Sequence, residues 1–406
     1  MKNIKTMAKD IEKDVIKWFE ELHQIPELHD QLPETTAYVK SVLEELGIPY
    51  NIYSNSGIRA VISCSDVPDK TKCHSKKEKV IAFRADMDAL PVTEETGLPY
   101  ASKHEGCMHA CGHDAHTAML LGAAKVFTEI KEQLEGKIVL LFQPAEETSG
   151  GAKIMIDEGC LKAPDVDMLI NFHSGRLFPG IGNGQVGWKK GSVMAAVDTF
   201  NVTVKGKGGH GAYPDECIDP IPVACQMILA LQNIVSREIK PTHGAVITTG
   251  ELHAGTLVNI IPDTASFGGT IRTLDPEDRK TVCRRMEEIF RGIASATRTE
   301  ADVKISHAYP VSVNDSGAVD FFIESASKIV GRENMVEIQD ASTGTEDISY
   351  YLQEVPGCFG TLGSLAPHID GICYPHHNSK FRIAEDCLYL GTAIYAQCGV
   401  DFLTKE

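Results

Sequence analysis

The chain has 406 residues, of which 43% are hydrophobic and 23% are charged, and its 39 basic and 56 acidic side chains give a formal net charge of −17. This length is more than one hydrophobic core usually supports, so we expect two domains, and the composition excludes a largely disordered protein. A surface this acidic repels phosphate backbones, which argues against nucleic-acid binding.

Residues 1–25 carry charges throughout and lack the apolar core of a signal peptide, so they predict an amphipathic helix. No segment approaches the roughly 20 apolar residues that cross a membrane. The 12 cysteines are scattered along the chain, and without an export signal we expect reduced thiols packed as small apolar side chains. These features predict a cytoplasmic protein that binds neither nucleic acid nor membrane.

The first half of the chain alternates apolar runs with a helical pattern. Near-continuous apolar strands are predicted at 79–84, 137–143 and 166–172, and a helix at 115–134. Strands that alternate with helices indicate an α/β domain built on a largely parallel sheet. The polar stretch at 66–79 is predicted to be an exposed loop.

The pattern changes near residue 190. From there we predict a strand at 197–204, a helix at 221–237, strands at 245–252 and 264–272, a helix starting at Asp275 and a strand at 303–307. The order β-α-β-β-α-β is the ferredoxin-like arrangement. We therefore expect a small domain of residues 190–308 inserted into a larger α/β domain made of residues 1–189 and 309–406.

The densest group of reactive side chains lies at 107–116, where two Cys, three His and one Asp fall within ten residues. Thiolate and imidazole ligands at this density favour a transition metal, with Zn²⁺ as the default ion. Cys111 and His113 are two residues apart, so in an extended segment both would point to one side. The alternative is a glycine-rich turn with incidental histidines.

Other candidate ligands follow predicted strands. They are Asp86 and Asp88, the pair Glu146–Glu147, and His173, and a late loop adds His376 and His377. Open α/β sheets place their sites at the carboxyl ends of strands. Each residue alone has a structural explanation, such as a solvated loop for the glutamates, but together they predict one site.

These motifs carry a family resemblance. The chain resembles the M20 metallopeptidase family, and within it the branch of aminoacylases, hippurate hydrolases and indole-acetyl–amino-acid hydrolases (subfamily D). The resemblance rests on the segments 84–91, 108–116, 143–147, 344–348 and 376–377, which occur in order over nearly the whole chain. It implies a catalytic domain with two divalent metal ions, Zn²⁺ or Mn²⁺ with Co²⁺ or Ni²⁺ as further options, and an inserted lid that also forms a homodimer.

The resemblance also implies residue roles. The implied metal ligands are Cys111, His113, Glu147, His173 and His377, with Glu146 as the general base and Asp88 as the carboxylate that orients a ligating imidazole. Spacing alone decides neither between the two glutamates nor between His376 and His377. Asp86 stands where more distant members carry a histidine ligand, so its role is open.

Within the insert, the resemblance implies that His210 reaches into the partner subunit's site and stabilises the oxyanion. Asn259 and Arg272 match positions that contact the substrate's carboxylate, a task that suits the guanidinium fork. The residues themselves also allow a surface histidine in a tight loop and a solvated arginine at a strand end. Thr148–Ser149, Asn171 and Asn378–Ser379 depart from the usual family pattern beside the proposed ligands, which affects substrate preference and not the chemistry.

We therefore predict metal-dependent hydrolysis of the amide bond of N-acyl amino acids. A carboxypeptidase or dipeptidase with the same metal site is the second hypothesis. A binding protein without catalysis is the third, and a redox or nucleophilic role for Cys111 is a further one. The acyl group, the amino-acid side chain and the native metal are not determined by the sequence.

Overall fold

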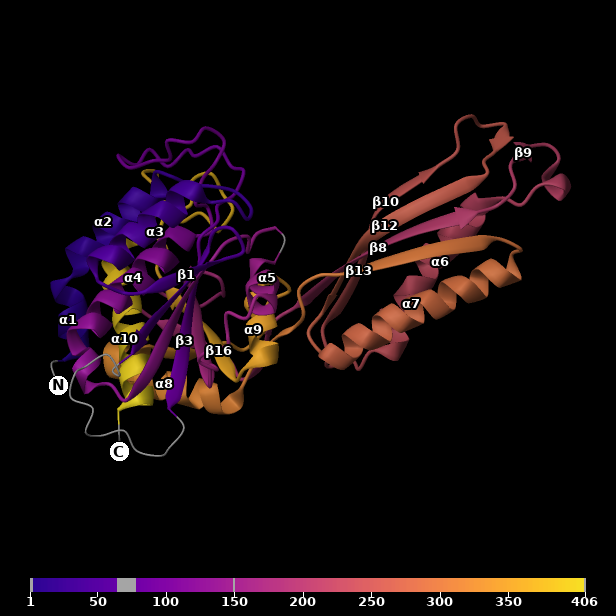
Figure 1. Ribbon diagram of the computed structural model, residues 1–406. Coiled ribbons are helices and arrows are strands. Elements are labelled where there is room, and N and C mark those ends of the chain that lie inside the picture. Colours follow the sequence, from indigo (N-terminus) through magenta and orange to yellow (C-terminus); the bar gives the residue numbers. More distant parts are fainter. Residues whose placement is uncertain (1–2, 64–77, 149, 405–406) are drawn as a thin grey trace. The chain divides into compact units, whose positions relative to one another are not determined.

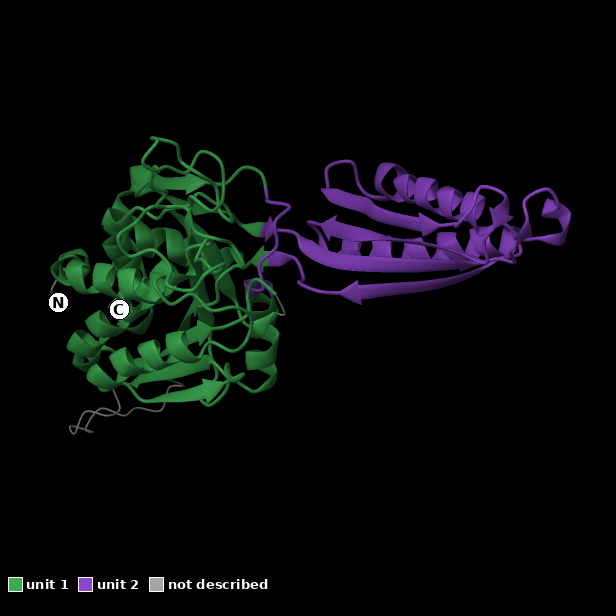
Figure 2. Ribbon diagram, turned by 90° about the horizontal axis from the view of Figure 1, so that it is seen from above, with its two compact units in different colours: residues 1–191, 313–340, 350–406 green, residues 192–312, 341–349 purple. Residues whose placement is uncertain are grey.

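The computed structural model describes residues 3–63, 78–148 and 150–404, so nearly all of the predicted loop at 66–79 lies outside the described residues. The chain divides into two compact units (Figure 2). Unit 1 comprises Met1–Gly191, Val313–Asp340 and Tyr350–Glu406, and unit 2 comprises Ser192–Ser312 and Ala341–Ser349.

Unit 1 is built on an eight-stranded sheet in the order β1-β2-β4-β3-β5-β16-β6-β15. The strands are β1 (Tyr50–Tyr53), β2 (Gly57–Ser63), β3 (Lys79–Asp86), β4 (Gly136–Gln143), β5 (Met168–Gly175), β6 (Val186–Trp188), β15 (Met335–Glu337) and β16 (Gly357–Gly363). The four adjacent strands β4, β3, β5 and β16 are parallel to one another, whereas β1 and β2 are antiparallel additions. The predicted α/β domain with a largely parallel sheet is confirmed.

Helices cover this sheet, and they explain why its central strands are apolar along their whole length. The helices of unit 1 are α1 (Ile4–Asp10), α2 (Glu12–His23), α3 (Pro33–Glu45), α4 (His113–Ile130), α5 (Gly151–Asp157), α8 (Ser316–Val330) and α10 (Leu388–Leu403). α4 and α10 pack on each other and on β3 (Figure 1). The predicted single N-terminal helix is in fact two helices, α1 and α2, which meet at Ile11.

Unit 2 has its own core and a four-stranded sheet in the order β10-β12-β8-β13, in which all neighbours are antiparallel. Its main elements follow the chain as β8 (Ala196–Lys205), α6 (Pro220–Asn233), β10 (Ala245–Ala254), β12 (Thr264–Thr273), α7 (Pro276–Ala296) and β13 (Glu300–His307). Asp275 caps α7 by accepting the backbone N–H groups of Glu277 and Asp278. Two short strands, β9 (Gly209–His210) and β11 (Ile260–Ile261), pair beside this sheet.

Three elements lie where the chain passes from one unit to the other, namely β7 (Gly191–Met194), β14 (Ser312–Asn314) and α9 (Ile348–Glu354). Compared with the predicted insert at 190–308, unit 2 also contains the segment 341–349. The backbone N–H of Ala195 donates to the carbonyl oxygens of Ser342 and Gly344, both at 3.0 Å. This pairing joins residues almost 150 positions apart in the chain, so no local pattern predicts it.

Candidate metal centre

The predicted ligands of unit 1 gather where parallel strands end. Asp86 is the last residue of β3, the Glu146–Glu147 pair follows the end of β4, and His173 lies two residues before the end of β5. Two sets of ligand atoms are found, and within each set the atoms lie within 4.8 Å of one another. One set is Cys111, His113 and His173, and the other is Cys111, Glu147 and His377. The structure thus brings all five predicted ligands together, and Cys111 belongs to both sets.

A glycine makes the turn between Cys111 and His113 possible. Gly112 has a φ of +85°, and a Cβ there would lie 3.0 Å from Ser174 Oγ and 3.2 Å from the Ile383 side chain. The expectation of an extended segment is wrong, because Gly112 is in the left-handed conformation and His113 is already the first residue of α4. Only glycine combines this φ with so close an approach to β5.

His113 is oriented by its neighbour on the loop after β3. Its Nδ1 lies 2.8 Å from the main-chain carbonyl oxygen of Asp88 and 3.4 Å from the Asp88 carboxylate. A proton on Nδ1 donated to the carbonyl leaves Nε2 with a lone pair directed toward the site. Asp88 therefore orients this imidazole mainly through its backbone.

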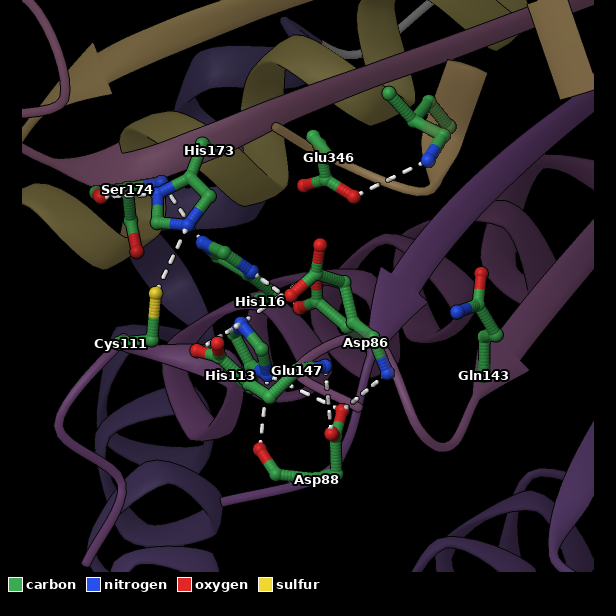
Figure 3. Close-up of polar contacts among 12 residues, drawn as sticks. Asp86, Asp88, Cys111, His113, His116, Gln143, Glu147, His173, Ser174 and Glu346 are labelled. Atoms are coloured by element: carbon green, nitrogen blue, oxygen red, sulfur yellow. Dashed lines mark hydrogen bonds and ion pairs between the residues drawn. The ribbon is translucent and has the colours of Figure 1, made fainter. Parts of the chain in front are cut away.

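The Asp88 carboxylate has a different use. Its two oxygens accept the backbone N–H groups of Glu146 and Glu147, each at 3.0 Å (Figure 3). This holds the turn after β4 against the loop after β3. Glu147 Oε1 then lies 3.2 Å from His377 Nε2 and 4.0 Å from His113 Nε2, and a carboxylate oxygen of Glu146 lies within 4.8 Å of His113 as well.

The two late histidines are distinguished by their contacts. The Nε2 of His376 lies 3.0 Å from the Ser174 carbonyl oxygen, and its ring fills the space that a Cβ on Gly175 would occupy. His377 instead faces Glu147, and its backbone N–H donates to the Ala110 carbonyl oxygen at 2.8 Å. These contacts favour His377 as the ligand and give His376 a packing role.

The charges of the site suit a bound cation. Burial and the nearby Glu147 and Glu146 raise the pKa of the Cys111 thiol well above its ordinary value. Burial alone would lower the pKa of His113, but Asp86 and Asp88 raise it to about 10. Without a metal, therefore, a proton on His113 supplies positive charge, and the thiol is not ionised. A nucleophilic or redox cysteine needs the opposite, a lowered pKa.

Several buried polar atoms lack a hydrogen-bond partner among the described residues, and one of them, His113 Nε2, belongs to a predicted ligand. Burial, with His116 and His376 nearby, lowers the pKa of His173 well below its ordinary value, so this imidazole is neutral as a ligand must be. Thiol, imidazole and carboxylate donors with unused lone pairs fit one or two divalent transition-metal ions.

Sequence reasoning missed three buried polar residues beside this centre. They are Arg84, His116 and Gln143, and each hydrogen-bonds near a strand end. A signal for His116 was present, since it lies three residues after His113 and shares its helix face. For Arg84 and Gln143 only their place within or at the end of an apolar strand marked them.

The residues predicted in the insert lie in unit 2 and form two groups. His210 on β9 pairs with Ile260 on β11, and the backbone N–H of Gly211 donates to Asn259 at 2.9 Å, so His210 and Asn259 are neighbours on an exposed surface. Arg272 lies near the other end of the sheet, where it pairs with Val197 and Val246. Burial lowers the pKa of the Arg272 guanidinium, while Asp198 acts in the opposite direction.

Comparisons with known proteins show which family the chain resembles. Residues 82–399 match the model of the peptidase family M20/M25/M40. The chain is 42% identical to N-acetyl-L-cysteine deacetylase of Bacillus subtilis (strain 168), over 93% of this chain and 85% of the relative. It is 38% identical to thermostable carboxypeptidase 1 of Saccharolobus solfataricus, over 100% of this chain and 99% of the relative.

A solved structure gives the same match. The Bacillus subtilis YXEP protein, described as a dinuclear metal binding peptidase from the M20 family, superimposes with a TM-score of 0.80 at 33% identity and covers 97% of this chain and 99% of its own. In the part of the chain that the structure describes, no helix has both the length and the apolar character needed to cross a membrane.

Proposed function

The chain belongs to the peptidase family M20/M25/M40 and is a metal-dependent hydrolase; on that premise we propose that it cleaves the amide bond of N-acyl amino acids. The observation that carries the proposal is the pair of ligand sets sharing Cys111, with Glu146 beside them as an additional carboxylate. The relatives include an N-acetyl-L-cysteine deacetylase at 42% identity, which favours a small acyl group on an amino acid.

In this proposal Cys111, His113, Glu147, His173 and His377 hold two divalent ions, Zn²⁺ or Mn²⁺, with Co²⁺ or Ni²⁺ as further options. Ions bound here would polarise the amide carbonyl and lower the pKa of water. Glu146 accepts a proton from the attacking water and delivers it to the amine nitrogen as the C–N bond breaks. The products are a carboxylic acid and a free amino acid.

Unit 2 supplies the remaining roles as a lid. His210 donates a hydrogen bond to the developing oxyanion, and Asn259 and Arg272 bind the free carboxylate of the amino acid. Strand β12 runs from Thr264, at the His210 end of the sheet, to Arg272 near the other end. At about 3.3 Å per residue, these two positions are about 26 Å apart. One small substrate cannot touch His210 and Arg272 of the same lid, which supports a homodimer in which they come from different subunits.

The surface of unit 2 offers an interface for such a dimer. β10 is an edge strand, and it exposes the apolar side chains Val246 and Leu252, at 45% and 47%, while α6 exposes Leu229 at 71%. An edge strand with apolar side chains is a ready template for pairing with a second chain. A cytoplasmic location, without nucleic-acid or membrane partners, completes the proposal, and the 10 described cysteines are free thiols, as expected in a reducing compartment.

A substrate panel tests the chemistry. The protein, stripped of metal and reconstituted with Zn²⁺, Mn²⁺ or Co²⁺, is assayed for free amino acid released from N-acetyl and N-benzoyl amino acids and from dipeptides. We expect the acylated amino acids to be the better substrates by kcat/KM. Preference for dipeptides would favour the second candidate, a carboxypeptidase or dipeptidase, for which the 38% identity to a carboxypeptidase speaks. Hydrolysis of neither class would refute both.

Mixed dimers test the lid. His210→Ala and Glu146→Gln homodimers are each expected to be inactive. If His210 acts on the partner's site, a heterodimer of the two variants contains one intact site, and a re-equilibrated equal mixture should regain about a quarter of wild-type activity. No recovery, with dimer exchange verified by mass spectrometry, would show that His210 acts within its own subunit or not at all.

A further inference from the structure

Two buried side chains at the centre remain outside the ligand set, Asp86 and His116, which are 0% and 2% exposed. Asp86 ends β3, and His116 lies in the first turn of α4. With His113 they form a third set of ligand atoms within 4.8 Å of one another. Proximity alone would therefore allow them to bind an ion, and their hydrogen bonds decide the question.

Both nitrogens of His116 are already used. The backbone N–H of Ser174 donates to His116 Nε2 at 2.8 Å, so Nε2 carries the lone pair and the ring proton is on Nδ1. That proton is donated to Asp86 Oδ1 at 2.5 Å (Figure 3). His116 consequently has no lone pair left for a metal ion.

Asp86 is engaged on both oxygens. While Oδ1 accepts from His116, Oδ2 accepts from Arg84 Nη1 at 2.6 Å. Arg84 in turn donates through Nε to Gln143 Oε1 at 2.9 Å. Gln143 is the last residue of β4, three positions before Glu146. The hydrogen bonds thus run from the end of β4 through β3 and α4 to β5.

The chain of hydrogen bonds ends next to a predicted ligand. Ser174 follows His173, whose Nδ1 lies 2.7 Å from the Ser174 carbonyl oxygen and whose Nε2 lies 3.4 Å from Cys111 Sγ. The rings of His116 and His173 meet edge to face with centroids 4.5 Å apart. Both the N–H and the C=O of Ser174 are therefore fixed by imidazoles, and the His173 ring has little freedom to turn.

We propose that Asp86 and His116 are positioning residues, which hold the backbone at Ser174 so that His173 Nε2 stays beside Cys111. The inference rests on the proposed function only in that His173 and Cys111 bind metal. It predicts that loss of His116 weakens the binding of an ion without removing a binding site. Changes to residues of this kind typically cost about 10- to 100-fold in metal affinity.

The experiment is a Co²⁺ titration of the metal-free full chain, followed by visible absorption and by elemental analysis at saturation, without substrate. The variant His116→Phe keeps an aromatic ring at this position but loses both hydrogen bonds. We expect it to bind two ions, with one dissociation constant raised about 10- to 100-fold. His116→Gln, whose amide oxygen can accept from Ser174, should recover part of this loss. His173→Ala, a direct ligand change, should bind one ion.

A control separates positioning from general loosening of α4. Thr392 on α10 donates through Oγ1 to the carbonyl oxygen of Met119 on α4, at 3.2 Å in a buried contact. Thr392→Val therefore lowers stability but should leave Co²⁺ affinity unchanged. If His116→Phe fails to fold, Asp86→Asn makes the same test with a smaller change of shape.

Four outcomes would count against the inference. One bound ion in His116→Phe at saturation would make His116 a ligand. Affinity equal to the wild type, or equal losses in Thr392→Val, would remove the positioning role while leaving the proposed function intact. Fewer than two ions in the wild type would instead refute the proposed function, and the inference with it.

Discussion

The carboxylate of Asp88 offers a test of how the glutamate pair is held in place. Asp88 is 1% exposed, and its two oxygens accept the backbone N–H groups of Glu146 and Glu147, while its carbonyl oxygen orients His113. In Asp88→Asn the amide retains one acceptor oxygen, and its NH₂ faces the other N–H. The change should therefore disturb the glutamate turn and leave the His113 orientation intact.

The magnitude follows from one lost bond. A hydrogen bond to a charged group contributes about 1.5–3 kcal/mol, and 1.4 kcal/mol corresponds to tenfold in an equilibrium constant. If that free energy is lost from the metal-bound state, affinity for the ion beside Glu147 should fall about 10- to 150-fold. We expect kcat to fall as well, because the same turn carries Glu146.

The assay is Zn²⁺ competition with a chromophoric chelator, together with kcat at saturating metal. Asp315→Asn is a matched control, because Asp315 also accepts a backbone N–H, from Ala318 at 2.8 Å at the start of α8, where asparagine caps equally well. Unchanged Zn²⁺ affinity and kcat in Asp88→Asn would refute the reasoning. A loss of His113 as a ligand would refute the assignment of its orientation to the backbone carbonyl.

Three further predictions follow from the same site and from a buried histidine near it. Glu146→Gln should keep both metal ions and lose about 10²- to 10⁴-fold in kcat; near-normal kcat would remove Glu146 as the base. Chelation should abolish activity, and Zn²⁺, Mn²⁺ or Co²⁺ should restore it. Metal affinity should also rise with pH, because His113, with a pKa of about 10, must lose its proton before it binds a metal ion. A metal affinity that does not depend on pH would contradict this reasoning. Burial opposes a charge on His23, but hydrogen bonds to Asp114 and Glu94 raise its pKa to about 9. Because this pKa lies above that of a histidine in the unfolded chain, the charged His23 contributes about 3 kcal/mol to the free energy of unfolding. This contribution is complete below about pH 6.5 and is lost as the pH rises through 9. Urea unfolding of the wild type should show this loss, and His23→Gln should be less stable with a flatter pH profile.

Much of the site could be predicted because of one property of parallel sheets. Their strands all end at the same edge, so the ligand-bearing segments after β3, β4 and within β5 had to meet wherever the chain folded as α/β. The order of strands and helices in unit 2 was equally readable, since its alternating and helical periodicities are local. Both rest on patterns within about ten residues of sequence.

The tertiary structure decided which atoms are free. His376 and His377 are adjacent and chemically identical in the sequence, and only the contact of His376 with Ser174 and of His377 with Glu147 separates them. His116 looks like a ligand by its spacing from His113, but Ser174 and Asp86 occupy both its nitrogens.

Asp88 shows the same limit. The family resemblance implied that its carboxylate orients an imidazole. In the structure the Asp88 carbonyl oxygen lies closer to His113 Nδ1, at 2.8 Å, than the carboxylate does, at 3.4 Å, and the carboxylate also holds the glutamates. The chemical types gathered at the sheet edge could be predicted, because strand ends and motif composition are properties of short segments. Which lone pairs remain for a metal depends on hydrogen bonds between segments far apart in the chain, such as Asp88 to Glu147, 59 positions apart, and His376 to Ser174, 202 positions apart. Only the folded chain forms them.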